Sequence, residues 1–132
     1  MPKTINGPSF EEFVENQFDQ LDIHYEAQYQ ASGINKDFNK IDIVLLDEYE
    51  NPLEAISLKY QNDAGTADEK VCFEAYSLSL MCQVHNIAQA TIVLAGPGWS
   101  EAKLYWYLYE FKAPPNVRII SYNQFEQEYI TN

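Results

Sequence analysis

Basic residues are scarce in this chain of 132 residues, which has eight lysines and arginines against twenty aspartates and glutamates. Arg118 is the one arginine, and the formal net charge is −12. Proteins that hold nucleic acid tightly normally have a basic surface, because lysine and arginine neutralise the phosphates. The composition therefore argues against tight binding of nucleic acid, whereas weak binding assisted by divalent cations and action through a protein partner are both compatible with this charge.

Cysteines and long apolar runs are also few. Cys72 and Cys82 fall ten positions apart in one expected helix, about 15 Å along its axis, which is too far for a disulfide bond. We expect reduced thiols, and neither the cysteines nor His24 and His85 have the spacing of a zinc site. Reduced thiols suggest a cytoplasmic protein. The polar N-terminus and the lack of a long apolar run predict no signal peptide and no membrane span.

The chain also lacks internal repeats, low-complexity tracts and recognisable linkers. Its hydrophobic content of 46% is sufficient for a real core at this length. We therefore expect a single domain over residues 1–132.

Two neighbouring strands are expected over residues 39–46 and 53–61, joined by a hairpin turn at 47–52. Because side chains alternate along a strand, Asp42 and Lys59 lie on the polar face of this pair, and we expect them to meet across one rung. A carboxylate beside a lysine on one sheet face is what metal-dependent phosphodiester cleavage requires. The other polar residues on this face are Lys40, Ser57 and Gln61.

This pattern resembles the PD-(D/E)XK nuclease superfamily, which includes many restriction endonucleases. Asp42 matches the first acid of that family and Lys59 its lysine. The position two before the lysine is usually an acid, and here it is Ser57. Some restriction enzymes carry Ser or Thr there and take the missing carboxylate from the following helix, as Glu74 would supply it. The resemblance implies a Mg²⁺-dependent endonuclease that hydrolyses DNA, with Mn²⁺ able to substitute.

The helix that carries Glu74 is expected to begin at Thr66, because Thr66 and Glu69 form a capping box. Glu74 lies about 60° from the centre of the apolar stripe of this helix, so it borders the buried face. The stripe itself consists of Val71, Ala75, Leu78, Cys82 and His85.

A second capping box, formed by Ser9 and Glu12, predicts an N-terminal helix with one apolar face. Many members of the superfamily place a glutamate of this helix beside the metal. By helical angle Glu11 is the best placed, at about 80° from the apolar stripe, and Glu15 follows at about 120°. For both residues a solvated helix face remains an equally good interpretation.

The remaining pattern predicts an α/β fold with a mixed central sheet flanked by helices. The order is the αβββαβ core of the restriction-endonuclease-like fold with an extra αβα at the C-terminus. Besides the elements already described, we expect a strand over 23–30, a buried strand over 90–95, a helix over 100–111, a strand over 117–121 and a helix over 123–130. Aromatic residues near the 100–111 helix are interpreted as core or interface rather than as a base-stacking platform. They are Trp99, Tyr105, Trp106, Tyr107 and Tyr109.

The resemblance assigns roles to individual residues. The expected Mg²⁺ ligands are Asp42, Glu74, the Leu58 carbonyl and Glu11. Lys59 would orient the attacking water and neutralise developing charge. Gln61 would position the water or the scissile phosphate, and the expected substrate-binding residues are Lys36, Lys40, Ser57 and Lys70.

Two arrangements remain open. Cutting both strands of a DNA duplex requires two small subunits, so a homodimer is expected for an active enzyme. The alternative is a nuclease-like module that has lost catalysis and regulates a protein partner through its acidic surface. Ser57 and the net charge favour this alternative, whereas the joint presence of Asp42, Lys59 and Glu74 opposes it.

Overall fold

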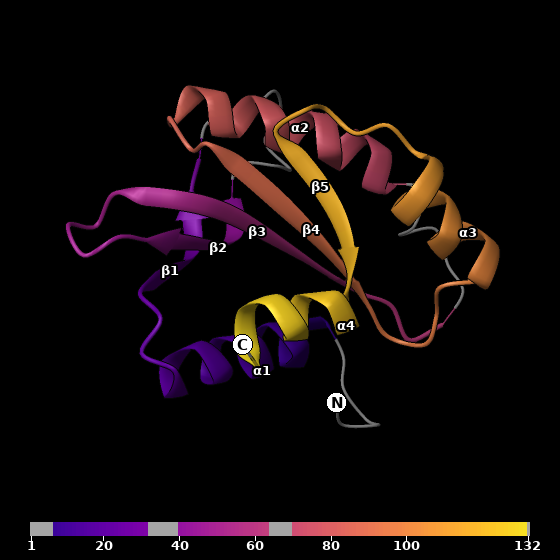
Figure 1. Cartoon of the computed structure of the whole chain (residues 1–132), viewed down its shortest axis with the longest axis horizontal. Helices are drawn as coiled ribbons and strands as arrows, with labels where there is room; N and C mark the ends of the chain where they lie inside the picture. The colour runs from indigo at the N-terminus through magenta and orange to yellow at the C-terminus, as the bar shows by residue number, and fades with distance from the viewer. Residues whose placement is uncertain (1–6, 32–39, 64–69, 132) are drawn as a thin grey trace.

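The computed structural model describes residues 7–31, 40–63 and 70–131. Five strands form one mixed sheet in the order β1-β2-β3-β4-β5, in which β1, β2 and β3 are antiparallel and β3, β4 and β5 are parallel (Figure 1). The elements are α1 (Gly7–Gln20), β1 (Tyr25–Gln30), β2 (Lys40–Leu46), β3 (Pro52–Tyr60), α2 (Val71–Val84), β4 (Gln89–Ala95), α3 (Glu101–Tyr105), the π-helical turn η3 (Trp106–Glu110), β5 (Val117–Ser121), α4 (Tyr122–Phe125) and the π-helical turn η4 (Glu126–Ile130).

Helices cover both faces of the sheet. The first and last helices, α1 and α4, lie together on one face, and α2 crosses the other face (Figure 1). The core is divided accordingly: Phe10, Val14 and Phe18 of α1 pack with Phe125 against one side, whereas the apolar residues of α2 pack against the other. The fold is thus restriction-endonuclease-like, and the predicted order of helices and strands is confirmed.

The helix starts differ from the prediction. Helix α1 begins at Gly7, so Ser9 lies within its first turn and is not the N-cap. Pro8 explains the earlier start, because proline has no N–H to leave unpaired in a first helical turn. Helix α2 begins at Val71, with Lys70 at the N-cap position and no side-chain hydrogen bond to cap it. The predicted Thr66–Glu69 capping box lies outside the described residues.

Strand β2 does not keep strict alternation. Val44 packs with the α2 side of the core and Ile43 with the α1 side, as expected. Ile41, however, packs with the α2 side, although it is only two residues from Ile43. The alternation therefore breaks at Asp42, which is the residue that the prediction placed at the candidate site.

A glycine loop follows β4 and packs tightly on the end of β3. Gly96 has a φ of +95°, and a Cβ there would lie 2.4 Å from the Gln61 carbonyl oxygen. A Cβ at Gly98 would lie 2.6 Å from the carbonyl oxygen of Asp63. Only glycine permits this approach, so the loop after β4 is fixed against the loop after β3.

Two further expectations concern the cysteines and the membrane. Cys72 and Cys82 are both free thiols. In the described part of the chain, no helix combines the length and apolar character needed to cross a bilayer.

Candidate active site

The strands β2 and β3 separate at Asp42. Their ladder pairs Ile43 with Ile56, so the next pair along it would be Asp42 with Ser57, and Lys59 lies two residues further on. The expectation that Asp42 and Lys59 share one rung was thus two residues off. The Leu58 N–H instead donates a 2.7 Å hydrogen bond to Asp42 Oδ2. The carboxylate therefore occupies the gap between the strands and accepts a backbone hydrogen bond there.

Glu74, in the first turn of α2, reaches β3 between two of its polar side chains. Ser57 Oγ donates a 2.9 Å hydrogen bond to Glu74 Oε1, and Lys59 Nζ lies 2.9 Å from Glu74 Oε2. Oε2 is buried and accepts no hydrogen bond within the described structure, so its interaction with Lys59 is an ion pair without hydrogen-bond geometry. The helix carboxylate is thus held above the strand position where the family usually has an acid.

Glu11 of α1 adjoins Asp42. The pKa of Glu11 is raised from 4.5 to about 7, chiefly by burial and then by the negative charge of Asp42 and a hydrogen bond with it. Gln28 Nε2 donates a long 3.4 Å hydrogen bond to Glu11 Oε2. For Glu15, burial and the charges of Asp19, Glu12 and Asp42 raise the pKa, with no hydrogen bond to Asp42 among the causes. Of the two candidates, Glu11 is therefore the one in contact with Asp42.

Lys59 interacts with carboxylates from two helices, Glu11 of α1 and Glu74 of α2. Its positive charge lowers the pKa of Glu11, opposing the effect of Asp42, while its Nζ pairs with Glu74. The structure thus gathers the acidic pair of Glu11 and Asp42, and the hydrogen-bonded Glu74 and Ser57, around this lysine. Two carboxylates in contact must share either a proton or a cation, because both cannot stay charged cheaply in a partly buried place.

The donor set suits a hard divalent cation. All the candidate ligands are oxygens, and Mg²⁺ typically binds through one or two carboxylates while keeping several waters. Glu11 and Asp42 already adjoin, and Glu74 Oε2 is a buried oxygen without a hydrogen bond. Within residues 7–31, 40–63 and 70–131, no three His, Cys, Asp or Glu side chains form one group that would hold a metal ion. The fit therefore rests on the Glu11–Asp42 pair rather than on a complete cage.

Gln61 has a structural task at the end of β3. Its Nε2 donates a 3.1 Å hydrogen bond to the Gly98 carbonyl, and its backbone pairs with Ala95 and Gly98. Its Oε1 is buried without a partner among the described residues. Gln61 thus fastens the glycine loop to β3, and none of these hydrogen bonds is with Asp42, Lys59 or Glu74.

The predicted substrate-binding lysines are scattered. Lys40 is exposed at the start of β2, two residues before Asp42. Lys70 is exposed one helical turn before Glu74. Lys36 lies outside the described residues.

Sequence reasoning missed two features of the structure, a polar network and a cavity. At the start of β3 and β4, Thr91 Oγ1 and the Tyr129 hydroxyl each donate a 2.5 Å hydrogen bond to Glu54 Oε2, and Arg118 donates to Thr91 and Tyr129. This network satisfies a buried carboxylate and joins η4 to the sheet. Thr91 stands out in the sequence as a polar residue within a buried strand, and Arg118 as the one arginine.

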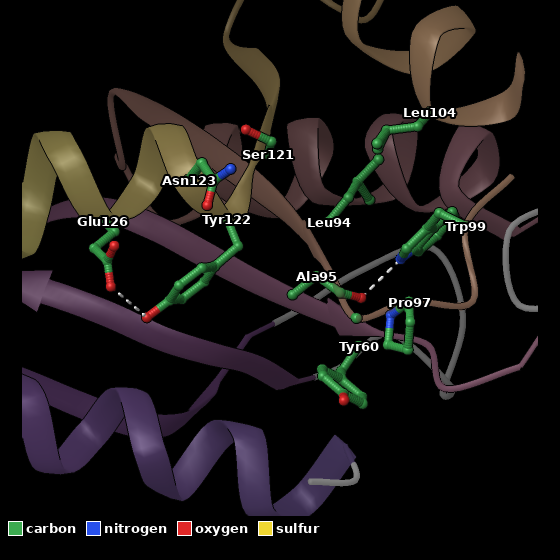
Figure 2. A pocket seen from close by; sticks show the side chains of 11 residues that line it. Tyr60, Leu94, Ala95, Pro97, Trp99, Leu104, Ser121, Tyr122, Asn123 and Glu126 are labelled. Atoms are coloured by element: carbon green, nitrogen blue, oxygen red, sulfur yellow. Dashed lines mark hydrogen bonds between the residues drawn. The ribbon is translucent and has the colours of Figure 1, made fainter. Parts of the chain in front are cut away.

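The second missed feature is a cavity at the other end of the parallel strands. Figure 2 shows it between the end of β3, the loop after β4 and the start of α4. Tyr60, Trp99 and Glu126 line it, and Trp99 had been interpreted as core or interface. The available signal was position, because open parallel sheets bind ligands beyond the carboxyl ends of their strands.

A mixed sheet covered by helices on both faces, with acids and a lysine gathered where β2, β3 and α2 approach one another, defines a restriction-endonuclease-like domain. The chain belongs to the PD-(D/E)XK nuclease superfamily: a family model described as a PD-(D/E)XK nuclease superfamily domain matches residues 4–127. This confirms the resemblance drawn from Asp42, Ser57 and Lys59. Members of the superfamily are generally nucleases that use divalent metals. A comparison with curated proteins gave no match.

Proposed function

We propose that this protein is a Mg²⁺-dependent endonuclease that hydrolyses phosphodiester bonds in DNA. The observation that carries the proposal is the position of Glu74, whose carboxylate contacts both Ser57 and Lys59. A carboxylate at position 57 would put its oxygens in the same region, so the helix acid replaces the missing strand acid. Ser57 is then a residue that orients the acid rather than a sign of lost activity.

In this proposal Asp42, Glu11, Glu74 and the Leu58 carbonyl hold the cation, which when bound polarises the phosphodiester and lowers the pKa of water. Lys59 orients the attacking water and stabilises the negative charge that develops on the phosphate oxygens. Its ion pair with Glu74 holds the ammonium group in place. Gln61, two residues after Lys59, is proposed to position the water or the scissile phosphate through its Oε1, which has no hydrogen-bond partner among the described residues.

We further propose that Lys40, Lys70 and Lys36 attract the DNA backbone. Three lysines cannot offset a net charge of −12, so substrate binding is expected to be weak and sensitive to salt. Cations held by the acidic pair lower the local negative charge and make approach of a phosphate possible.

Two copies of the chain are proposed to meet through the outer face of α2. Phe73, Tyr76, Leu80 and Val84 form a stripe along this face and are between 41% and 62% exposed. The Tyr76 ring packs edge-on against the Phe111 ring, with 6.5 Å between the ring centroids, which extends the apolar surface beyond the helix. The stripe carries no charge, so two acidic chains can associate there without bringing carboxylates of the two copies together. The two active sites of such a dimer could cut both strands of a DNA duplex.

A second function is favoured by a specific observation. The candidate acids do not form a complete metal group in the described residues. A nuclease-derived module without catalysis, which acts through a protein partner, would have the same fold and the same acidic surface. The two functions differ in whether a metal is bound and DNA is cut.

Incubation with DNA tests the proposal. The parent and Asp42→Asn are compared on single-stranded, duplex and branched DNA, in Mg²⁺ and then in Mn²⁺. Asparagine keeps an oxygen that can accept the Leu58 N–H but loses the charge, so the variant should fold and fail to cut. Cleavage by the parent alone supports the endonuclease. If the parent cuts none of the substrates, or if Asp42→Asn cuts as well as the parent, the endonuclease proposal is rejected.

A further inference from the structure

A cavity of about 490 Å³ lies at the carboxyl ends of β3, β4 and β5 (Figure 2). Tyr60, the last residue of β3, contributes to its wall and directly follows Lys59. The volume falls in the range of sites for small ligands. None of the residues given a catalytic, metal-binding or substrate-binding role above lines this cavity, so its chemistry has to be explained separately.

One part of the cavity wall is aromatic and fixed. Trp99 is buried, and its Nε1 donates a 2.8 Å hydrogen bond to the Ala95 carbonyl, so the indole cannot turn away (Figure 2). The Tyr60 ring packs against Phe10 with a centroid distance of 5.4 Å. Flat apolar walls of this kind favour a planar ligand, because aromatic side chains bind planar rings by stacking and edge contacts.

Another part of the cavity wall is polar. Asn123 and Glu126, both on the C-terminal helical segment, line the cavity beside Ser121. The Tyr122 hydroxyl donates a 3.3 Å hydrogen bond to Glu126 Oε2. A carboxylate has several acceptor sites on its two oxygens, so Glu126 can also accept hydrogen bonds from a ligand. A planar ligand with an amino group on its edge matches this combination.

The cavity is joined to the acidic pair by α1. The Phe10 ring packs against the Tyr60 ring and also against the Tyr122 ring, whose centroid lies 5.6 Å from that of Phe10. The next residue, Glu11, is the one that adjoins Asp42. If the phosphate of a nucleotide lay at Glu11 and Asp42, the base of that nucleotide or of its neighbour could therefore reach the cavity.

We infer that this cavity binds one unstacked nucleobase with an exocyclic amino group, adenine or cytosine for example, beside the phosphodiester to be cut. The inference rests on the proposed endonuclease function and specifies its substrate as single-stranded or locally unpaired DNA. A base enters such a cavity only after leaving its stack, which costs least where it is unpaired. Thymine fits poorly, because the carbonyl oxygens that flank its N–H repel the Glu126 carboxylate.

Nucleoside binding tests the inference without cleavage. The ¹⁵N-labelled protein is titrated in EDTA with deoxyadenosine, deoxycytidine and thymidine, which carry no phosphate, and the two indole N–H signals are followed. We expect the Trp99 signal to shift and saturate with the two amino-bearing nucleosides, and thymidine to bind roughly fivefold or more weakly. The signal of Trp106, which is exposed and does not line the cavity, should stay in place.

Glu126→Gln should weaken binding of deoxycytidine by roughly tenfold, because a charged acceptor is lost. Glu110→Gln, an exposed residue that does not line the cavity, makes the same charge change and should bind like the parent. An unmoved Trp99 signal, equal binding of thymidine, or unchanged binding by Glu126→Gln would each overturn the inference.

The two proposals fail in different ways. Nucleoside binding by a protein that cuts no DNA would reject the endonuclease and with it the assignment of the cavity to a cleaved substrate. Cleavage of DNA by a protein that binds no nucleoside would reject the base site and leave the endonuclease standing.

Discussion

Ser57 and Glu74 share a buried hydrogen bond of 2.9 Å, although one lies in the middle of β3 and the other in the first turn of α2. A serine in place of an acid removes a negative charge from the strand. The hydroxyl donor keeps the helix acid directed at the lysine, where a second strand carboxylate would repel it. In the proposed endonuclease, the helix acid Glu74 thus takes the place of the strand acid that is missing at position 57.

Lys59→Ala should lower cleavage at least about a hundredfold, because it removes the positive charge beside the reacting phosphate. The same change leaves Glu74 buried without its ion pair and should cost about 1–3 kcal/mol of unfolding free energy. Adding Glu74→Gln to Lys59→Ala should cost less than the sum of the single changes, which denaturant unfolding of all three variants would measure. Lys112→Ala, at an exposed site, is the control. Cleavage retained by Lys59→Ala would remove this lysine from the mechanism.

Glu74→Gln should weaken binding of Mg²⁺ and Mn²⁺ by roughly tenfold or more, since a neutral amide replaces a charged oxygen ligand. The amide oxygen can still accept the Ser57 hydroxyl, so the fold should persist. Isothermal calorimetry measures the affinity, and Glu101→Gln on the exposed start of α3 serves as the charge-matched control. Equal metal affinity in parent and Glu74→Gln would show that the helix acid is no ligand.

Glu11 predicts a pH dependence of stability. Its pKa is raised from 4.5 to about 7 in the folded protein, chiefly by burial and then by Asp42. The folded state then binds more protons than the unfolded state between these pH values, so this group lowers stability as pH rises from about 4.5 to about 7. Relative to the parent in EDTA, Glu11→Gln should therefore lose less stability over this range in thermal melts.

Magnesium provides the complementary measurement for Glu11. If the Glu11–Asp42 pair holds the cation, Mg²⁺ should raise the melting temperature of the parent more at pH 8 than at pH 5, because protons no longer compete. Glu11→Gln should show a smaller gain. The same pH dependence in parent and variant would contradict the assignment.

Leu80→Glu should convert the proposed dimer to a monomer, because it places a charge in the apolar stripe of each copy. Leu80 is 41% exposed, so the monomer should remain folded. Light scattering coupled to gel filtration measures the molar mass. Tyr49→Glu adds a charge at the exposed hairpin turn and should leave the dimer intact. A monomeric parent would reject the dimer.

The order of strands and helices was predictable because it depends on local patterns. Alternation marked the strands, Gly96 and the adjacent Pro97 marked the end of β4, and Ser100 caps α3 by accepting the Lys103 N–H. The same patterns placed Asp42 and Lys59 on adjacent strands. What they could not show was that β2 and β3 separate at Asp42, since the separation depends on a hydrogen bond to the distant Leu58 N–H.

Contacts between distant elements were the least predictable. Helical angles indicated that Glu74 borders the core, but not that Ser57 would donate to it. The cavity requires the end of β3, the loop that carries Trp99 and the helical turn that carries Glu126 to come together. The sequence pattern of each segment predicts its own secondary structure but not its contact with the other two segments.

The first turn of α2 determines how long the acid stays in place. A carboxylate borne by a central strand could leave only if the sheet opened, whereas Glu74 follows a helix start whose N-cap residue, Lys70, makes no capping hydrogen bond through its side chain. The ends of helices fray at a fraction of the free energy of global unfolding. The free energy of local opening at the start of α2 therefore determines the fraction of molecules in which Glu74 is in position. Hydrogen exchange at the start of α2 reports this free energy, whereas the melting temperature does not.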